Sequence, residues 1–237
     1  MIGIIKKYLF RLVNKAQEEN RKNILRLLPD IENKVCILDL GCDDGFWTTR
    51  LGEKYESSKL YGVEVVKERA RKARENGVDV KDFDLNGRFD FADNYFDIIH
   101  SNQVVEHLYD TDNFISEVFR ILKPGGYFIV STVSLSSWHN IFASFLGFQP
   151  FDLANISLKG NIGNPPSFWS ETETDNSRNK SWQHVRLFTP YSLSKFLKIY
   201  GFKDLAVLTS GYYPLPNIFS RLDKVHSHYF VIRTRKR

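Results

Sequence analysis

The sequence has little of several features that mark special classes of protein. Its 237 residues include only two cysteines, Cys36 and Cys42, and eight prolines against 14 glycines. The two cysteines match neither a disulfide framework nor a zinc motif, which favours a reducing, cytoplasmic setting. No apolar run reaches the roughly 18 residues of a membrane span. The apolar N-terminal stretch is broken by charges and lacks a small-residue cleavage site, so no signal peptide is predicted.

Charge is distributed unevenly along the chain. Residues 1–26 hold seven bases and two acids, which accounts for the whole net charge of +5. We expect residues 1–34 to form a basic amphipathic helical segment, for which three roles stay open. It could contact an anionic membrane, cover an anionic substrate, or only pack on the domain edge. The charge is modest and no RNA-binding motif is present, so no nucleic-acid partner is predicted. The sequence does not indicate an oligomeric state.

Apolar runs bounded by turn residues alternate with segments of helical period. We predict strands over 35–41, 60–66, 78–85, 95–102 and 127–133. Such alternation favours an α/β fold with a parallel sheet covered on both faces, and ligands bind at the carboxyl ends of such strands. The alternation of strands and helices stops in the aromatic-rich residues 134–184. Because this segment follows the fifth strand, we expect it to lie as a lid over the sheet edge where ligands bind. The alternation resumes with a predicted helix over 189–202, which Thr189 would cap at its N-terminus, and with two further strands.

The stretch ILDLGCDDGFWTTRLG, residues 37–52, runs from a predicted strand into a glycine turn. It has neither the dinucleotide fingerprint nor the P-loop pattern, and Asp43 and Asp44 would repel a pyrophosphate. The turn therefore suits a neutral or cationic ligand. Glu64 follows 23 positions after Gly41, at the end of the second predicted strand, where a carboxylate can accept both hydroxyls of a ribose.

With these pieces the chain resembles the class I S-adenosylmethionine-dependent methyltransferases of small-molecule type. The resemblance rests on LDLGCDDG, GVEVV, DFDL, YFDIIHSNQVVEHL and ILKPGGYFIV, in this order, across residues 35–133. It implies a three-layer α/β sandwich with a mostly parallel seven-stranded sheet whose last strand is antiparallel. Residues 35–133 would form the S-adenosylmethionine-binding core, and 185–237 would complete the sheet. Where this family usually keeps a glycine, the chain has Asp43.

The resemblance also implies a set of cofactor contacts. The methionine part would lie beside Asp39 and Gly41, and Gly45 would let a helix N-terminus approach its carboxylate. Glu64 would bind the ribose. The remaining contacts would come from Cys42, from Val65 on the adenine, from Asp84 and Leu85 at the adenine amino edge, and from Asn102 at the methionine tail or the substrate.

The expected reaction is methyl transfer to an oxygen, nitrogen or carbon atom of a small molecule. A general base is needed only for some acceptors, and His107 and His184 are the candidates, each of which could instead be structural. Glu106 beside His107 could hold a metal, as in some relatives that methylate phenols, but no metal site is predicted. The segment NPPS, 164–167, is interpreted as a turn in the lid. Two alternatives stay open: methylation of RNA or protein, and a binding protein without turnover, which Asp43 favours.

Overall fold

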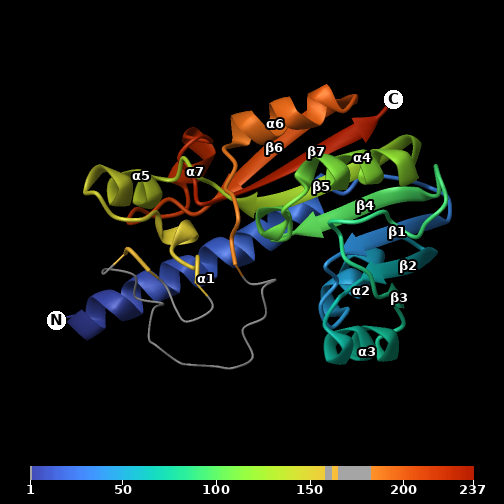
Figure 1. Cartoon of the computed structure of the whole chain (residues 1–237), viewed down its shortest axis with the longest axis horizontal. Helices are drawn as coiled ribbons and strands as arrows, with labels where there is room; N and C mark the ends of the chain where they lie inside the picture. The colour runs from blue at the N-terminus through green and yellow to red at the C-terminus, as the bar shows by residue number, and fades with distance from the viewer. Residues whose placement is uncertain (1, 158–161, 165–182) are drawn as a thin grey trace.

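The computed structural model describes residues 2–157, 162–164 and 183–237, and its centre is a seven-stranded sheet (Figure 1). The strand order is β3-β2-β1-β4-β5-β7-β6. The strands are β1 (Val35–Leu40), β2 (Ser58–Val63), β3 (Asp79–Lys81), β4 (Phe96–Asn102), β5 (Leu122–Val133), β6 (Phe202–Ser210) and β7 (Tyr229–Lys236). The first five pair in parallel, whereas β7 runs antiparallel to both β5 and β6. The predicted sheet is confirmed.

Helices cover both faces of this sheet. They are α1 (Ile2–Leu27), α2 (Phe46–Gly52), α3 (Lys67–Glu75), α4 (Thr111–Ile121), α5 (Trp138–Phe145), α6 (Pro190–Ile199) and α7 (Phe219–Leu222), with the 3-10 turns η1 (Val105–His107) and η2 (Phe151–Leu153). Adjacent strand residues point to opposite faces. Leu38 packs in one buried cluster with α4 and α6, and Ile37 packs in another with α1 and α2. The three layers follow from this alternation.

Local signals in the sequence fix several helix ends. Thr189 caps α6 through a reciprocal pair of hydrogen bonds with Ser192, and Pro190 takes the first helical position, as predicted. Asp110 caps α4 by accepting a hydrogen bond from the Asn113 amide. Gly77, with φ of 83°, follows the end of α3. These caps leave few terminal amides of the two helices without a partner.

The structure corrects three predicted strand boundaries. Strand β2 ends at Val63 rather than at residue 66, and β3 covers only Asp79–Lys81 rather than 78–85. In both cases a carboxylate turns the chain: Glu64 accepts the Val66 amide, and Asp84 accepts the Asn86 amide. Strand β5 is longer than predicted and begins at Leu122, with an irregular register between Phe96 and Ile98 of its neighbour.

The segments outside the predicted core are partly described. Helix α1 lies across the sheet, and its Asn20 donates hydrogen bonds to Asn102 and Ser131. The predicted short helix of the insert is α5. Residues 158–161 and 165–182, with part of the predicted aromatic lid and three residues of NPPS, lie outside the described part of the chain. Within the described residues, no helix has both the length and the apolar character needed to cross a membrane.

Candidate functional site

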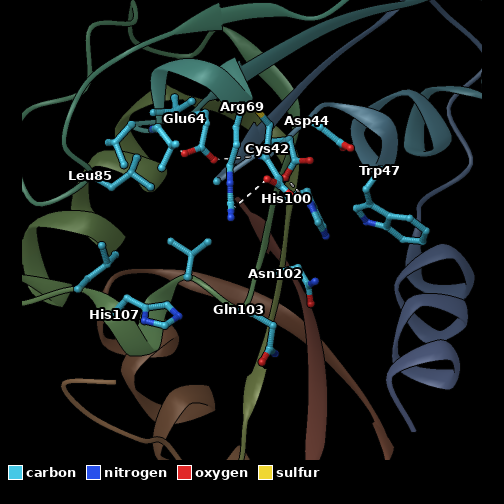
Figure 2. Close-up of a pocket in the computed structure, with 18 of the residues that line it drawn as sticks. Cys42, Asp44, Trp47, Glu64, Arg69, Leu85, His100, Asn102, Gln103 and His107 are labelled. Carbon is cyan, nitrogen blue, oxygen red and sulfur yellow. Dashed lines mark hydrogen bonds and ion pairs between the residues drawn. The ribbon is translucent and has the colours of Figure 1, made fainter. Parts of the chain in front are cut away.

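A cavity of about 1050 Å³ opens at the carboxyl ends of β1, β2 and β4 (Figure 2). Every predicted site residue except Gly45 lines it. Glu64, Arg69 and Leu85 lie on one side and His107 and Gln103 on the other. The position agrees with the rule that ligands bind where parallel strands end.

The turn after β1 depends on left-handed backbone conformations. Gly41 has φ of 80°, and a Cβ there would lie 2.5 Å from the Val104 side chain. Asp43 has φ of 50°, donates its amide to Glu64 at 3.1 Å and pairs with Arg69 at 3.1 Å. Aspartate tolerates this conformation better than most residues. The chain therefore keeps the turn although Asp43 stands where the family it resembles keeps glycine.

Gly45 does not line the cavity. It has φ of 79°, and a Cβ there would lie 2.8 Å from the Ala73 backbone and 3.1 Å from the Val78 side chain. The residue must therefore be small so that the start of α2 can pack against α3. The cavity lining gives no support to the predicted contact between Gly45 and the cofactor.

Glu64 is held at the rim by its own loop. It is 8% exposed, and its two oxygens accept the amides of Asp43 and Val66 at 3.1 and 2.8 Å. A carboxylate oxygen has two acceptor positions, so each oxygen keeps one for a further donor. Val65, next to it, is half exposed and faces the cavity. Glu64 can accept hydrogen bonds from two adjacent hydroxyls, and Val65 can cover one face of a planar ring.

Asp84 and Leu85 line the cavity from the loop after β3. One Asp84 oxygen accepts both the backbone amide and the side-chain amide of Asn86, at 2.9 and 2.8 Å. Cys42, on the other side, is buried, and its sulfur leaves no room for a side chain at Gly62. Burial raises the pKa of the Cys42 thiol, so this cysteine is a packing residue and no nucleophile.

His100 is a cavity residue that the sequence does not reveal. It lies in β4, and its Nδ1 is 2.7 Å from a carboxylate oxygen of Asp39, whose other oxygen accepts the Thr48 hydroxyl at 2.6 Å. The His100 Nε2 is buried without a partner among the described residues. Two hydrogen bonds therefore fix the Asp39 carboxylate at the end of β1.

At the bottom of the cavity, the end of β4 contacts α1. Asn102 ends β4 and its side-chain oxygen accepts a hydrogen bond from Asn20 at 3.2 Å. The next residue, Gln103, has φ of 57°, and its side-chain nitrogen is buried without a partner among the described residues. A buried amide donor of this kind is unfavourable unless a ligand accepts its hydrogen bond.

Two further cavity residues that the sequence does not reveal, Arg21 and Trp47, lie on helices. Arg21 of α1 lies over the ring of Trp47 of α2, 5.9 Å from its centroid, and both line the cavity. Arg21 is a cation that lines the same cavity as the acids Asp43 and Asp44. Nothing in the pattern of 1–26 distinguishes Arg21 from the other bases of that segment.

His107 and His184 meet at the far side of the cavity, with ring centroids 4.7 Å apart. The His107 Nδ1 is 3.1 Å from the Gln183 carbonyl, and the His184 Nδ1 bonds to the Asp152 carbonyl. A carbonyl only accepts, so both Nδ1 atoms carry the proton and each Nε2 is an acceptor. Burial, with the neighbouring His184, lowers the pKa of His107 to about 4, and burial also lowers the pKa of His184. Both rings are neutral at pH 7.

Glu106 lies directly behind these histidines. It is fully buried, and neither carboxylate oxygen has a hydrogen bond of good geometry within the described residues. Burial raises its pKa to about 7. Ligand atoms of Glu106, His107 and His184 lie within 4.8 Å of one another and could hold a metal ion, and so could those of His139, Asp152 and His228. In the second group each His Nε2 already bonds to the Asp152 carboxylate.

Comparisons with known proteins agree with this fold and cavity. The family model for the methyltransferase domain matches residues 12–207. A probable S-adenosylmethionine-dependent methyltransferase of Mycolicibacterium smegmatis is 34% identical over 101 residues, which cover 40% of this chain and 37% of that protein. The phosphoethanolamine N-methyltransferase of Triticum aestivum is 24% identical over 203 residues, or 82% of this chain and 40% of that protein. The matches thus span about two fifths of each curated relative.

Solved structures share the fold. A SAM-dependent methyltransferase from Thermotoga maritima superposes with a TM-score of 0.63 at 19% identity, over 100% of this chain and 96% of that one. Phosphoethanolamine N-methyltransferase 2 of Haemonchus contortus, solved with S-adenosyl-L-methionine, gives 0.61 at 15% identity, over 92% of this chain and 52% of that one. These likenesses show that the chain has the same fold as the two methyltransferases.

The chain belongs to the methyltransferase domain family, and its cofactor is S-adenosylmethionine. The resemblance drawn from five short motifs is therefore confirmed for family, fold and cofactor. The roles of the individual site residues stay predictions.

Proposed function

We propose that the chain transfers a methyl group from S-adenosylmethionine to a small molecule bound beside His107 and His184. The observation that carries this proposal is the arrangement of the cavity. Glu64, with one free acceptor position on each oxygen, stands on one side, and two neutral imidazoles stand on the other. Glu64 suits the ribose of the cofactor. The imidazoles suit a methyl acceptor that carries an O–H or N–H group.

The charges of the cavity match the charges of this cofactor. Asp39, Asp43 and Asp44 line the side where the sulfonium and the amino group would lie. Arg21 is then the residue that meets the carboxylate of the methionine part. Adenine would lie between Val65 and Leu85, with Asp84 at its amino edge. No phosphate is involved, so the acidic turn is no obstacle.

The bound cofactor supplies the reactive methyl group, and the protein supplies orientation and exclusion of water. His107 and His184 each present an Nε2 acceptor, which holds the O–H or N–H of the substrate in a defined direction. With its pKa near 4, His107 stays neutral through the physiological range and takes a proton only from a group made acidic by methylation. These residues therefore act first as positioning groups and second as proton acceptors.

The named relatives indicate the range of acceptors to test. They include a malonyl-[acyl-carrier protein] O-methyltransferase, ubiquinone biosynthesis O-methyltransferases and phosphoethanolamine N-methyltransferases. We infer an oxygen or nitrogen nucleophile on a small molecule. Methylation of RNA or protein has no feature of the described residues in its favour. The non-enzymatic alternative loses its main argument, because Asp43 adopts the conformation that the turn requires.

The test is transfer of a radiolabelled methyl group to phosphoethanolamine, a phenol and a malonyl thioester. The variants are His107→Gln and His184→Gln, with His226→Gln outside the cavity as the control. We expect kcat with the accepted substrate to fall about 100-fold in the first two variants while cofactor affinity is kept. An unchanged kcat in both would contradict the proposed role.

Chelation separates this mechanism from one that uses a metal ion. We expect the wild-type rate to survive treatment with EDTA. Loss of activity that Mg²⁺ or Zn²⁺ restores would instead assign Glu106, His107 and His184 as ligands of a cation. Methyl transfer itself would still stand in that case, but the imidazoles would no longer be the proton acceptors.

A further inference from the structure

Large apolar side chains are exposed together at the end of the molecule away from α2 and α3. Helix α5, the segment 212–226 and the first half of α1 all lie toward this end (Figure 1). Phe142 and Phe145 of α5 are 63% and 82% exposed, and Ile218 and Leu222 of the second segment are 61% and 83% exposed. We call this surface the apolar face; it also includes Tyr8, Trp138, Ile141, Leu146, Leu215 and Val225.

Side-chain contacts join the three segments into one surface. The Trp138 ring stacks on His226 at 4.2 Å, and its nitrogen donates to the Tyr212 hydroxyl at 2.8 Å. Tyr212 stacks in turn on Phe219 of α7. The Tyr8 hydroxyl of α1 donates to the Pro214 carbonyl at 3.4 Å. A contiguous exposed surface of this kind is unusual on a protein that has no partner for it.

Most charges around the apolar face are positive, although Glu18 and Glu19 follow Lys15 on α1 and Glu19 lies 3.6 Å from Arg221. Lys7, Arg11 and Lys15 follow at intervals of four on α1, are exposed, and have no acid in residues 2–17 beside them. Arg221 and Lys224 are exposed next to Leu222. The one acid of the segment 212–226, Asp223, is engaged by the Tyr212 hydroxyl and by His226.

From this combination we propose that the apolar face docks on an anionic lipid surface. Aromatic and aliphatic side chains on short helices, next to exposed lysine and arginine, are typical of proteins that bind at a membrane interface. The apolar residues would enter the headgroup region while the bases meet lipid phosphates and carboxylates. Arg21, six residues after Lys15 on the same helix, lines the cavity, so α1 connects the lipid surface to the site. The inference does not depend on the proposed function, because binding needs no methyl transfer.

The test is cosedimentation of the full chain with vesicles. We expect binding to vesicles of phosphatidylcholine with phosphatidylserine, weak binding to phosphatidylcholine alone, and loss of binding at high salt. The double variant Phe145→Ser, Leu222→Ser should weaken binding at least about tenfold. The pair Lys7→Gln, Arg11→Gln should weaken it about fivefold for each base removed.

Matched controls use exposed residues of α6. The pair Tyr191→Ser, Ile199→Ser, at 76% and 72% exposure in the wild type, and the pair Lys195→Gln, Lys198→Gln should bind like the wild type. Calorimetric binding of S-adenosylmethionine verifies that each variant is folded. No binding of the wild type to anionic vesicles at low salt would overturn the proposal. So would an equal loss in the controls. A concentration-dependent dimer that the first double variant dissociates, without vesicle binding, would assign the face to a second copy instead.

Discussion

At the scale of single residues, Asp43 shows how a substitution in a tight turn can be accommodated. Its φ of 50° lies in the left-handed region, where most side chains are strained. Its amide donates to Glu64, and its carboxylate pairs with Arg69, which lines the same cavity. Asp43 thus holds the Glu64 carboxylate through its backbone amide. The turn needs the conformation, and aspartate is among the residues that can adopt it.

Replacement by valine should expose this requirement. We expect Asp43→Val to lower the free energy of unfolding by about 1–2 kcal/mol, because a β-branched residue is disfavoured at positive φ. Asp43→Gly should stay within about 1 kcal/mol of the wild type, because relief of strain offsets the added freedom of the unfolded chain. Urea unfolding measures both. The control Asp44→Val loses only the hydrogen bond to the Phe46 amide, and a loss there as large as in Asp43→Val would contradict the account.

The sequence predicts those site residues that sit at recognisable positions of a motif. Glu64 is predicted from its position at the end of the second strand and Asp39 from the family resemblance, and both line the cavity. His100 is not predicted, because within YFDIIHSN it occupies an ordinary strand position and its partner Asp39 is 61 residues away. Arg21 and Trp47 are missed for the same reason, since their pairing depends on how α1 crosses the sheet. Residues that meet only through the tertiary fold leave no local signal.

At the scale of elements, the turn η2 connects the insert to the side of the cavity that holds His184. The Asp152 carboxylate accepts hydrogen bonds from Asn140 of α5 and from His139 and His228, while its backbone carbonyl holds the His184 ring. Burial would raise the pKa of Asp152, but His228 and His139 hold it well below its usual range. The ionised Asp152 side chain therefore fixes α5 and the start of β7 relative to each other, and the backbone carbonyl of the same residue holds His184.

Asp152→Asn should disturb all three. The nitrogen of the new asparagine would face the hydrogen-bond donors of Asn140, His139 and His228, and it cannot accept from them. We therefore expect the free energy of unfolding to fall by about 3 kcal/mol. We also expect kcat to fall while the affinity for S-adenosylmethionine is kept, because a shift of the Asp152 backbone would move the His184 ring, whereas Glu64 is held by the amides of Asp43 and Val66. Urea unfolding, calorimetry and methyl transfer measure the three quantities. The control is Asp204→Asn, an exposed carboxylate paired with Arg237. Equal effects in the two variants would contradict the account.

The order and type of the core elements follow from hydrophobic period alone, but their ends do not. Strands β2 and β3 stop early because Glu64 and Asp84 turn the chain with their side chains. The same acids are then presented at the rim of the cavity. Hydrophobic periodicity and strand propensity do not distinguish an acidic residue within a strand from one that ends the strand. The same hydrogen bonds that turn the chain also place these acids in the cavity lining.

At the scale of the whole molecule, the pKa values of two neighbouring groups are shifted in opposite directions: Glu106, which is buried behind the cavity, and His107, which lines it. The pKa of Glu106 is raised to about 7, so the folded state holds a proton that the unfolded state releases above pH 4.5. This contribution to stability is lost as the pH rises from 4.5 to 7. The pKa of His107 is lowered to about 4, so its contribution is gained as the pH rises from 4 to 6.5. Each amounts to about 3 kcal/mol, and they offset each other.

Single variants should separate these two contributions. In Glu106→Gln only the histidine terms remain, and we expect stability to rise by about 3 kcal/mol from pH 4 to 6.5. In His107→Gln we expect stability to fall by a similar amount from pH 4.5 to 7. The wild type should vary less than either. Chemical unfolding at a series of pH values measures all three, and parallel profiles would show that the two groups are not buried as described.

The central claim is that this cavity binds S-adenosylmethionine through Glu64, and calorimetric titration of the cofactor tests it most directly. The wild type should bind, and Glu64→Ala should bind at least about 30-fold more weakly, because two charge-assisted hydrogen bonds to the ribose are lost. Glu75→Ala, which removes an exposed carboxylate of α3 paired with Arg71, should bind like the wild type. Absence of binding in the wild type, or equal affinity in all three proteins, would contradict the account.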